Sequence, residues 1–244
     1  MYKGMYVAMT GSVLRSQELD TIANNLANAS TVGYKRESFS STMYAVQSRN
    51  QGSPDSLYPD ARIMAMHSGK TFMDNSVGNM KSTGNPLDVA INGEGYFAVQ
   101  GPGAGQVFYT RNGVFGLDKE GFVVSSAGSK VLDTSDRPIR ITGEGLVNIL
   151  SDGSINQNNA AVGKLKMVTV GNPWHVGGSL VSGTETGPAR GEIVQGTVEM
   201  SNVNPMLEMV GIINALREYE VSQKVITNFD TLTQRAVTDI AKVG

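Results

Sequence analysis

The two ends of this chain carry helix-patterned apolar sequence, and they enclose a glycine-rich middle. Residues 3–36 and 203–243 have apolar residues at three- and four-residue steps, whereas the stretch between them is broken by turn residues. Terminal segments usually fray unless another element holds them in place. A chain whose ends are its least self-sufficient parts is therefore predicted to assemble with partners.

The composition narrows the class of protein. A length of 244 residues suffices for one large domain or two small ones. Only 17% of residues are charged, and 20 Lys and Arg face 22 Asp and Glu without a basic run, which argues against both a disordered chain and a nucleic-acid-binding protein. The 29 glycines favour turn-rich β-structure. Because the chain has no cysteine, disulfides and thiolate chemistry are excluded.

Neither a cleaved export signal nor a membrane span is predicted. The apolar residues near the N-terminus are interrupted by Thr10, Gly11, Ser12 and Arg15. This run is too broken for the apolar region of a secretory signal, and no stretch approaches the ~20 apolar residues of a spanning helix. We therefore expect no insertion into a membrane.

The N-terminal segment predicts a helix that ends near Gly33. Gly33 is expected to supply a left-handed position at that end. Asn24 and Asn25 are poor helix formers and leave two interpretations: a solvated face that bonds locally, or amides that bond the backbone of a neighbouring chain. The helical pattern rests on these apolar residues: Met5, Met9, Val13, Leu19, Ile22, Ala23 and Leu26.

The middle of the chain predicts antiparallel β-structure. Residues 37–80 are polar and irregular and are interpreted as an extended connector with short strands. Residues 81–200 contain short β-branched and aromatic runs bounded by turns, typical of a sandwich or partly open barrel. Asn112-Gly113 is a two-residue hairpin signal. The expected fold class is therefore α+β, with a central antiparallel β-rich domain between two terminal helices.

The C-terminal segment, residues 201–244, is the clearest helix. Pro205 suits the first helical position and Glu208 the first turn. Ile212, Tyr219, Ile226, Thr233 and Ile240 form a seven-residue column, and further apolar residues flank it on both sides: Met209, Leu216, Val225, Phe229, Leu232, Ala236 and Val243. This arc spans roughly 200° at about 100° per residue, wider than one N-terminal helix covers. It packs either on the chain's own core or on helices of other subunits.

The sequence contains no recognisable catalytic or metal-binding constellation. His67 and His175 are isolated from carboxylates at ligand spacing, so no metal and no cofactor is expected. Residues 101–105 (GPGAG) lack the Lys-Ser/Thr of a phosphate loop and precede a strand pattern, so they are interpreted as a hairpin loop. We expect no enzymatic activity.

Several segments together resemble the bacterial flagellar rod and hook proteins. Residues 19–36 (LDTIANNLANASTVGYKR) resemble the signature ANNLAN-x-x-T-x-G-[FY]-[KR] of that family. Residues 201–205 (SNVNP), followed by Arg217-x-Tyr219-Glu220, are similar to its C-terminal element. Residues 85–97 and 109–113 also match, so the resemblance covers nearly the whole chain in the family's order. Length and the sequence after residue 205 are more similar to proximal than to distal rod proteins.

The resemblance implies a structural subunit of the flagellar basal-body rod. It implies helical assembly with copies of itself and with neighbouring rod proteins, and passage through the flagellar type III export apparatus into the periplasm without signal cleavage. It implies assembly segments at 1–36 and 201–244, and it favours bonding between subunits for the asparagines. The expected assembly residues are Ile22, Asn24, Asn25, Leu26, Asn28, Met209, Ile212, Leu216, Tyr219, Ile226, Phe229, Leu232, Ala236 and Ile240. The alternatives are a distal rod or hook-type axial protein, and a soluble β-domain binding module whose helices pack on their own core.

Overall fold

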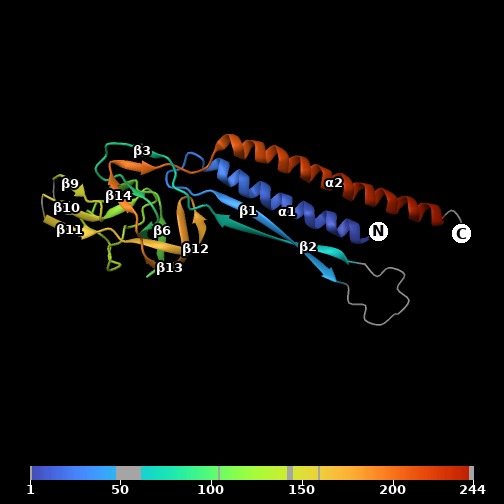
Figure 1. Cartoon of the computed structure of the whole chain (residues 1–244), viewed down its shortest axis with the longest axis horizontal. Helices are drawn as coiled ribbons and strands as arrows, with labels where there is room; N and C mark the ends of the chain where they lie inside the picture. The colour runs from blue at the N-terminus through green and yellow to red at the C-terminus, as the bar shows by residue number, and fades with distance from the viewer. Residues whose placement is uncertain (1, 48–61, 104, 142–144, 159, 242–244) are drawn as a thin grey trace. The chain divides into compact units, whose positions relative to one another are not determined.

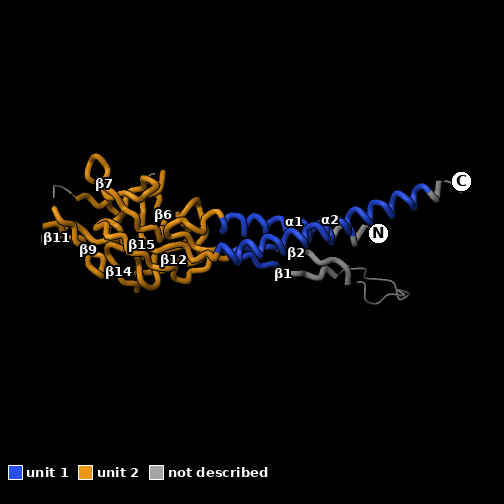
Figure 2. Tube along the Cα trace, turned by 90° about the horizontal axis from the view of Figure 1, so that it is seen from above, with its two compact units in different colours: residues 1–26, 37–71, 205–244 blue, residues 27–36, 72–204 orange. Residues whose placement is uncertain are grey.

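A computed structural model describes residues 2–47, 62–103, 105–141, 145–158 and 160–241 (Figure 1). The chain forms two compact units (Figure 2). Unit 1 comprises residues 1–26, 37–71 and 205–244, and unit 2 comprises residues 27–36 and 72–204. The expected α+β class, with terminal helices and a central antiparallel β-rich region, is confirmed.

The elements follow one another in a simple order. The helices are α1 (Tyr2–Ala27) and α2 (Pro205–Ala241). The strands of the first half are β1 (Glu37–Gln47), β2 (Arg62–Met73), β3 (Met80–Ser82), β4 (Val89–Asn92), β5 (Tyr96–Gln100), β6 (Val107–Thr110), β7 (Phe115–Leu117) and β8 (Val123–Ser125). Those of the second half are β9 (Val147–Ile149), β10 (Ser154–Gln157), β11 (Ala160–Lys164), β12 (Met167–Gly177), β13 (Leu180–Pro188), β14 (Glu192–Gln195) and β15 (Thr197–Glu199).

Unit 1 holds the two long helices and a two-stranded sheet. α2 begins at Pro205, as its sequence predicts, and runs for 37 residues. The predicted extent of the N-terminal helix, to about residue 36, is wrong because α1 ends at Ala27 and turns follow. The segment interpreted as a connector contains the strands β1 and β2, of 11 and 12 residues, which pair with each other.

Unit 2 is built around a closed four-stranded barrel in the order β12-β13-β6-β5. Its antiparallel register pairs Phe97 of β5 with Thr110 of β6 and with Met167 of β12. The smaller sheets are β11-β10-β9, β14-β4, β15-β3 and β7-β8. Phe97 is fully buried and meets Phe115 edge to face, with ring centroids 5.3 Å apart. The buried aliphatic and aromatic residues of these strands form the core of the unit.

The turn signals of the sequence have mixed outcomes. The loop that follows Gln100 joins the paired strands β5 and β6, which confirms the hairpin loop. The hairpin expected at Asn112-Gly113 is wrong, since the strands on either side pair elsewhere and neither residue has a positive φ. Instead the Asn112 side chain accepts a bond from the Val114 backbone N–H, 3.0 Å. A Cβ at Gly113 would collide with the Val89 carbonyl, so the glycine is required by close backbone approach.

Within the described residues, neither α1 nor α2 combines the length and apolar character that a membrane-spanning helix needs.

Candidate functional site

The two helices of unit 1 lie side by side and run antiparallel (Figures 1 and 2). Gln223 Nε2 donates to Ser12 Oγ at 3.0 Å, Arg15 pairs with Glu218 at 2.6 Å, and Asn25 Nδ2 donates to Glu208 Oε2 at 3.4 Å. The two residue numbers add to 235 in the first pair and to 233 in the other two. The register is therefore regular from one end of α1 to the other.

A single stripe of α2 is covered in this pairing. Glu208 and Ala215, only 2% and 3% exposed, lie on it, and the remaining members are half-buried: Ile212, Tyr219, Ser222, Ile226, Phe229, Thr233 and Ala236. These residues recur at three- and four-residue steps, the spacing of a helix packed on one neighbour. The predicted column thus turns toward the chain's own α1. The side chain of Ile240 lies outside the described residues.

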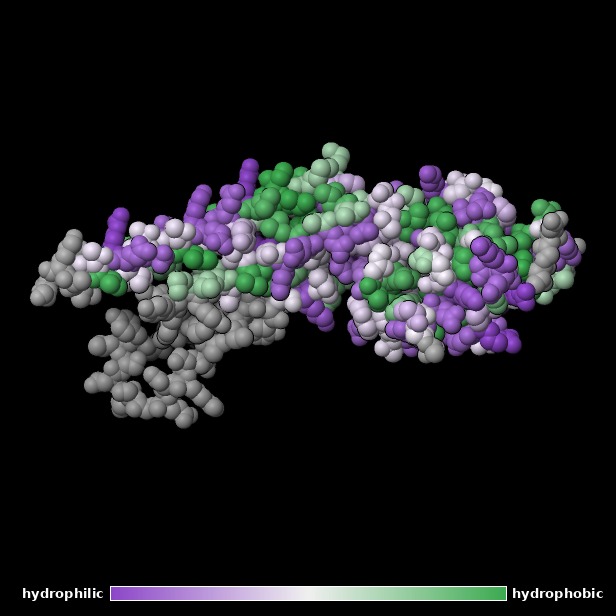
Figure 3. Space-filling view, turned by 180° about the vertical axis from the view of Figure 1, so that it is seen from behind, coloured by the Kyte–Doolittle hydropathy of each residue, from purple (hydrophilic) through white to green (hydrophobic). Residues whose placement is uncertain are grey.

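Large apolar side chains remain exposed on the first turns of α2. Met206 and Leu207 are 74% and 68% exposed, and Met209, Val210 and Ile213 are each about half exposed. We call these five residues the first-turn patch. Figure 3 shows hydrophobic side chains gathered over this part of α2. Glu208 is the one charged residue between 205 and 216, and it is buried against Asn25, so the patch itself carries no charge.

The expected assembly residues differ in exposure. Met209, Leu216 and Leu232 are exposed on α2, as is Asn24 on α1. Ile22, Leu26 and Asn28 are half-buried. Two apolar residues of the predicted α1 stripe, Met9 and Val13, are about half exposed.

Asn25 has partners inside its own unit, in contrast to the expected bond between subunits. It is 1% exposed. Its carbonyl oxygen accepts the Glu37 backbone N–H at 2.9 Å, and its amide donates to the Glu37 carbonyl at 2.8 Å. The side chain thus binds the first residue of β1 as a neighbouring strand would. The physical reason is that α1 ends at Ala27 and the chain folds back to place β1 beside Asn25.

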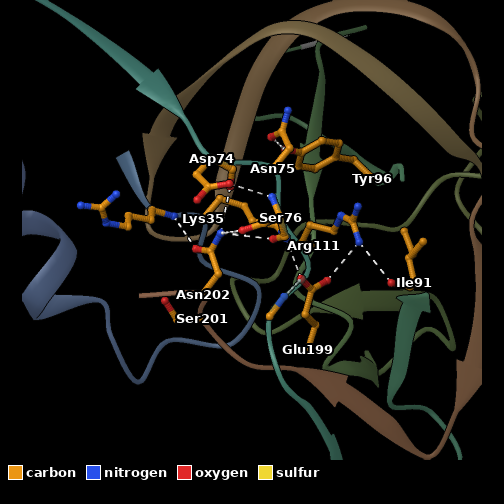
Figure 4. A network of polar contacts seen from close by, with 12 residues as sticks. Lys35, Asp74, Asn75, Ser76, Ile91, Tyr96, Arg111, Glu199, Ser201 and Asn202 are labelled. Atoms are coloured by element: carbon orange, nitrogen blue, oxygen red, sulfur yellow. Dashed lines mark hydrogen bonds and ion pairs between the residues drawn. The ribbon is translucent and has the colours of Figure 1, made fainter. Parts of the chain in front are cut away.

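Unit 2 contains a buried ion cluster that the sequence interpretation missed (Figure 4). Lys35 Nζ lies 2.6 Å from Glu199 Oε1, and Arg111 Nη1 lies 3.0 Å from Glu199 Oε2. All three side chains are at most 2% exposed. Burial lowers the pKa of Lys35, while the Glu199 carboxylate opposes that shift. Because the partners are 164 and 88 residues apart in sequence, no local pattern reveals them.

Backbone carbonyls complete this cluster. Lys35 Nζ donates to the Ser76 carbonyl at 2.6 Å, and Arg111 donates to the carbonyls of Ile91 at 3.1 Å and Gly93 at 2.7 Å. Two cations and one anion are thereby held by oxygen acceptors on every side. Such a cluster tolerates no missing member, because an unpaired buried charge is costly.

Asn202 joins three chain segments next to the ion cluster. Its carbonyl oxygen accepts the Arg36 N–H at 2.7 Å, and its amide donates to the carbonyls of Asp74 at 3.0 Å and Ser76 at 3.2 Å. The Asp74 N–H donates back to the Arg36 carbonyl at 2.8 Å. Residues 36, 74 and 202 lie close to positions where the chain passes from unit 2 to unit 1. Unit 2 therefore fixes the spacing of these segments.

The remaining signature residues pack inside unit 2. Gly33 has φ +70°, and a Cβ there would collide with the Asn112 backbone. Tyr34 is 2% exposed and stacks on His175, with ring centroids 4.6 Å apart. His175 Nε2 lies 2.8 Å from the Lys35 carbonyl. The left-handed glycine is thus confirmed, but it serves contact with the β-structure and lies six residues beyond the end of α1.

No cluster of three or more potential metal ligands occurs in the described part of the chain. His175 contacts Tyr34 and the Lys35 carbonyl, and the side chain of His67 lies outside the described residues.

Comparison with known proteins gives matches along nearly the whole chain. Residues 5–35 match the family model described as flagella basal body rod protein, residues 90–160 the D1 domain of flagellar hook protein FlgE/F/G, and residues 194–239 the C-terminal region of flagellar basal body rod FlgEFG protein. The flagellar basal-body rod protein FlgF of Caulobacter vibrioides is 33% identical over all of both chains. FlgF of Mesorhizobium japonicum is 34% identical over 90% of each chain. FlgG of Buchnera aphidicola subsp. Schizaphis graminum is 30% identical over 96% of this chain and 98% of its own.

Proposed function

The chain belongs to the family of flagellar basal-body rod proteins, and we propose that it enters the rod by helical self-assembly through its terminal helices. It is a structural subunit of the flagellar rod, FlgF-like in sequence. The proposal assigns residues 1–36 and 201–244 to assembly, and it places the subunit in the proximal part of the rod.

The observation that carries this proposal is the exposed apolar surface of α2. Pairing with α1 covers one stripe, and large aliphatic side chains outside that stripe remain about half exposed or more. Burying one such side chain contributes about 1.5–3 kcal/mol. A family member that assembles with other axial subunits has a use for this surface, because subunit contacts bury what the monomer leaves in water.

Helical stacking follows from contacts between unlike surfaces. A contact that joins one surface of a subunit to a different surface of the next does not close on itself, and repetition generates a helical filament. The partners we propose are copies of this chain and neighbouring rod proteins. Isolated helices are marginally stable in water, so helices that gain stability from their neighbours suit a chain that the flagellar export apparatus passes to the periplasm in unfolded form.

A charge placed on the exposed surface tests the proposal. Val210 is 55% exposed in the first-turn patch, so Val210→Asp leaves the α1 contact in place while it makes burial of the patch costly. We expect about a tenfold or greater loss of incorporation into purified basal bodies and loss of swimming, a tenfold change corresponding to about 1.4 kcal/mol. Ile226→Asp is a poorer choice because Ile226 is half-buried on the covered stripe.

Asn228→Asp is the matched control. Asn228 is exposed on the polar face of α2, and the variant adds the same charge eighteen residues further along the helix. This variant should incorporate normally. Circular dichroism of both purified chains checks that helix content is unchanged. Normal incorporation of Val210→Asp would contradict assembly through this surface.

A further inference from the structure

The last turns of α2 extend beyond the start of α1. Residue numbers of paired positions add to 233–235, and α1 begins at Tyr2, so α1 ends opposite residues 231–233 of α2. Within the described residues, the α2 segment from 232 onward has no α1 residue opposite it. Leu232 and Val237 are 52% and 63% exposed there. We call residues 232–238 the end segment.

The first-turn patch and the end segment are two unlike apolar surfaces of one helix. The patch spans residues 206–213 and the end segment residues 232–238, about two turns each at 3.6 residues per turn. The patch carries no exposed charge, and the end segment presents Leu232 and Val237 between uncharged threonines and one arginine. Surfaces of matched length and apolar character are suited to pack on each other.

One chain does not bring these two surfaces together. Met209 and Val237 are separated by 28 residues of the same helix, which corresponds to about 42 Å at 1.5 Å per residue. Contact between the patch and the end segment therefore requires two copies. Because the two surfaces differ, the contact is head-to-tail and does not close into a dimer.

We propose that the first-turn patch of one copy binds the end segment of α2 from a second copy. This inference rests on the proposed function and assigns the partner of the exposed α2 surface. Each copy then offers one patch and one end segment, so a row of subunits grows along the helix direction. The row leaves one uncovered patch at one end and one uncovered end segment at the other.

Cysteine crosslinking tests this contact directly, because the natural chain has no cysteine. The variant Met209→Cys/Val237→Cys is expressed in a strain that lacks the natural gene, and basal bodies are isolated and treated with a short bifunctional maleimide. Since the two cysteines of one chain are about 42 Å apart, a short crosslink joins only different copies. We expect a ladder of dimers, trimers and higher oligomers on a denaturing gel, and only isolated dimers when equal amounts of the two single-cysteine chains are co-expressed.

Controls separate this inference from the proposed function. Met209→Cys/Asn228→Cys moves one cysteine to the polar face and should give no ladder. Swimming and incorporation of the double variant with no ladder would overturn the patch-to-end-segment contact while leaving rod assembly intact. If the double variant is absent from basal bodies, purified Met209→Asp and Val237→Asp chains are mixed. Each keeps one intact surface, so a mixed dimer in analytical ultracentrifugation supports the contact, and its absence at concentrations where the natural chain associates refutes it.

Discussion

Lys35 and Glu199 form an ion pair of 2.6 Å that is almost completely shielded from water, although 163 residues separate them along the chain. Lys35 follows the N-terminal signature and Glu199 precedes the C-terminal one. Arg111, at the end of β6, shares the same carboxylate. The two sequence signatures therefore meet at one carboxylate in unit 2, and the first prediction concerns that carboxylate.

Glu199→Gln should destabilise the protein strongly. The substitution removes the one anion of the cluster and leaves Lys35 and Arg111 buried without compensation. Breaking a buried ion pair typically costs about 3–5 kcal/mol. Urea unfolding of the full chain measures this loss as a lower midpoint. Glu185→Gln is the control, because the Glu185 side chain is 40% exposed where it pairs with Lys166 and should contribute about 1 kcal/mol or less.

Gly33→Ala should cost more than Gly84→Ala, although the two glycines have nearly the same backbone conformation. Their φ angles are +70° and +71°. An alanine Cβ at position 33 would collide with the Asn112 backbone, whereas no heavy atom lies within 4 Å of one at position 84. Gly84→Ala therefore isolates the conformational cost of about 1–2 kcal/mol, and Gly33→Ala adds the displacement of Asn112. Equal unfolding midpoints for the two variants would contradict the close approach.

Asn25→Ala should loosen the start of β1. The variant removes both bonds to the Glu37 backbone and leaves those groups without their amide partner, which costs about 1–3 kcal/mol. Hydrogen exchange of the Glu37 amide should speed up, whereas the Lys166 amide, bonded to the Leu132 carbonyl in unit 2, should not change. An unchanged exchange rate at Glu37 would show that the Asn25 side chain does not protect that amide.

Tyr96 predicts a loss of stability at alkaline pH. Burial raises the pKa of Tyr96 to about 12 from 10.0, and its hydroxyl donates to Asn75 Oδ1 at 2.7 Å. Between pH 10 and 12 the folded chain keeps this proton while the unfolded chain loses it, so the folded state binds more protons. The free energy of unfolding then falls as pH rises through that window, by about 2–3 kcal/mol.

Tyr96→Phe isolates this effect. The difference in free energy of unfolding between the natural chain and the variant should be constant below pH 10 and shift toward the variant between pH 10 and 12. Lys35, whose pKa burial lowers, titrates in both chains, so its contribution largely cancels in the difference. A difference that stays constant to pH 12 would show that Tyr96 ionises in the folded protein as it does in water.

The helices were the most predictable part of the fold, because their signals are local. The sequence expectation for the C-terminal helix, residues 203–243, encloses α2 at 205–241. The N-terminal helix was extended too far, since residues 28–36 are polar and irregular but carry few strong helix breakers before Gly33. Turns around Gly121 and Gly153 were identified because a left-handed residue needs glycine there, with φ of 83° and 90°.

Features that depend on distant contacts were not predictable. Asn112-Gly113 looks like a hairpin turn, yet Gly113 is required by the Val89 backbone more than twenty residues earlier. Lys35 looks like a surface lysine after a helix, and only the folded chain brings Glu199 to it. The apolar arc of α2 was visible as periodicity, but its division into a stripe covered by α1 and an exposed patch depends on the register between two helices that lie at opposite ends of the sequence.

The backbone passes between unit 1 and unit 2 four times, at residues 26/27, 36/37, 71/72 and 204/205. A protease that cuts any one of these connections leaves three others, so a nicked chain keeps both units in one covalent or folded particle until it is denatured. Three of the four segments are also tied to one another through Asn202. A subunit built in this way shares a mechanical load among several parallel tethers, and failure of one peptide bond does not sever the shaft to which it belongs.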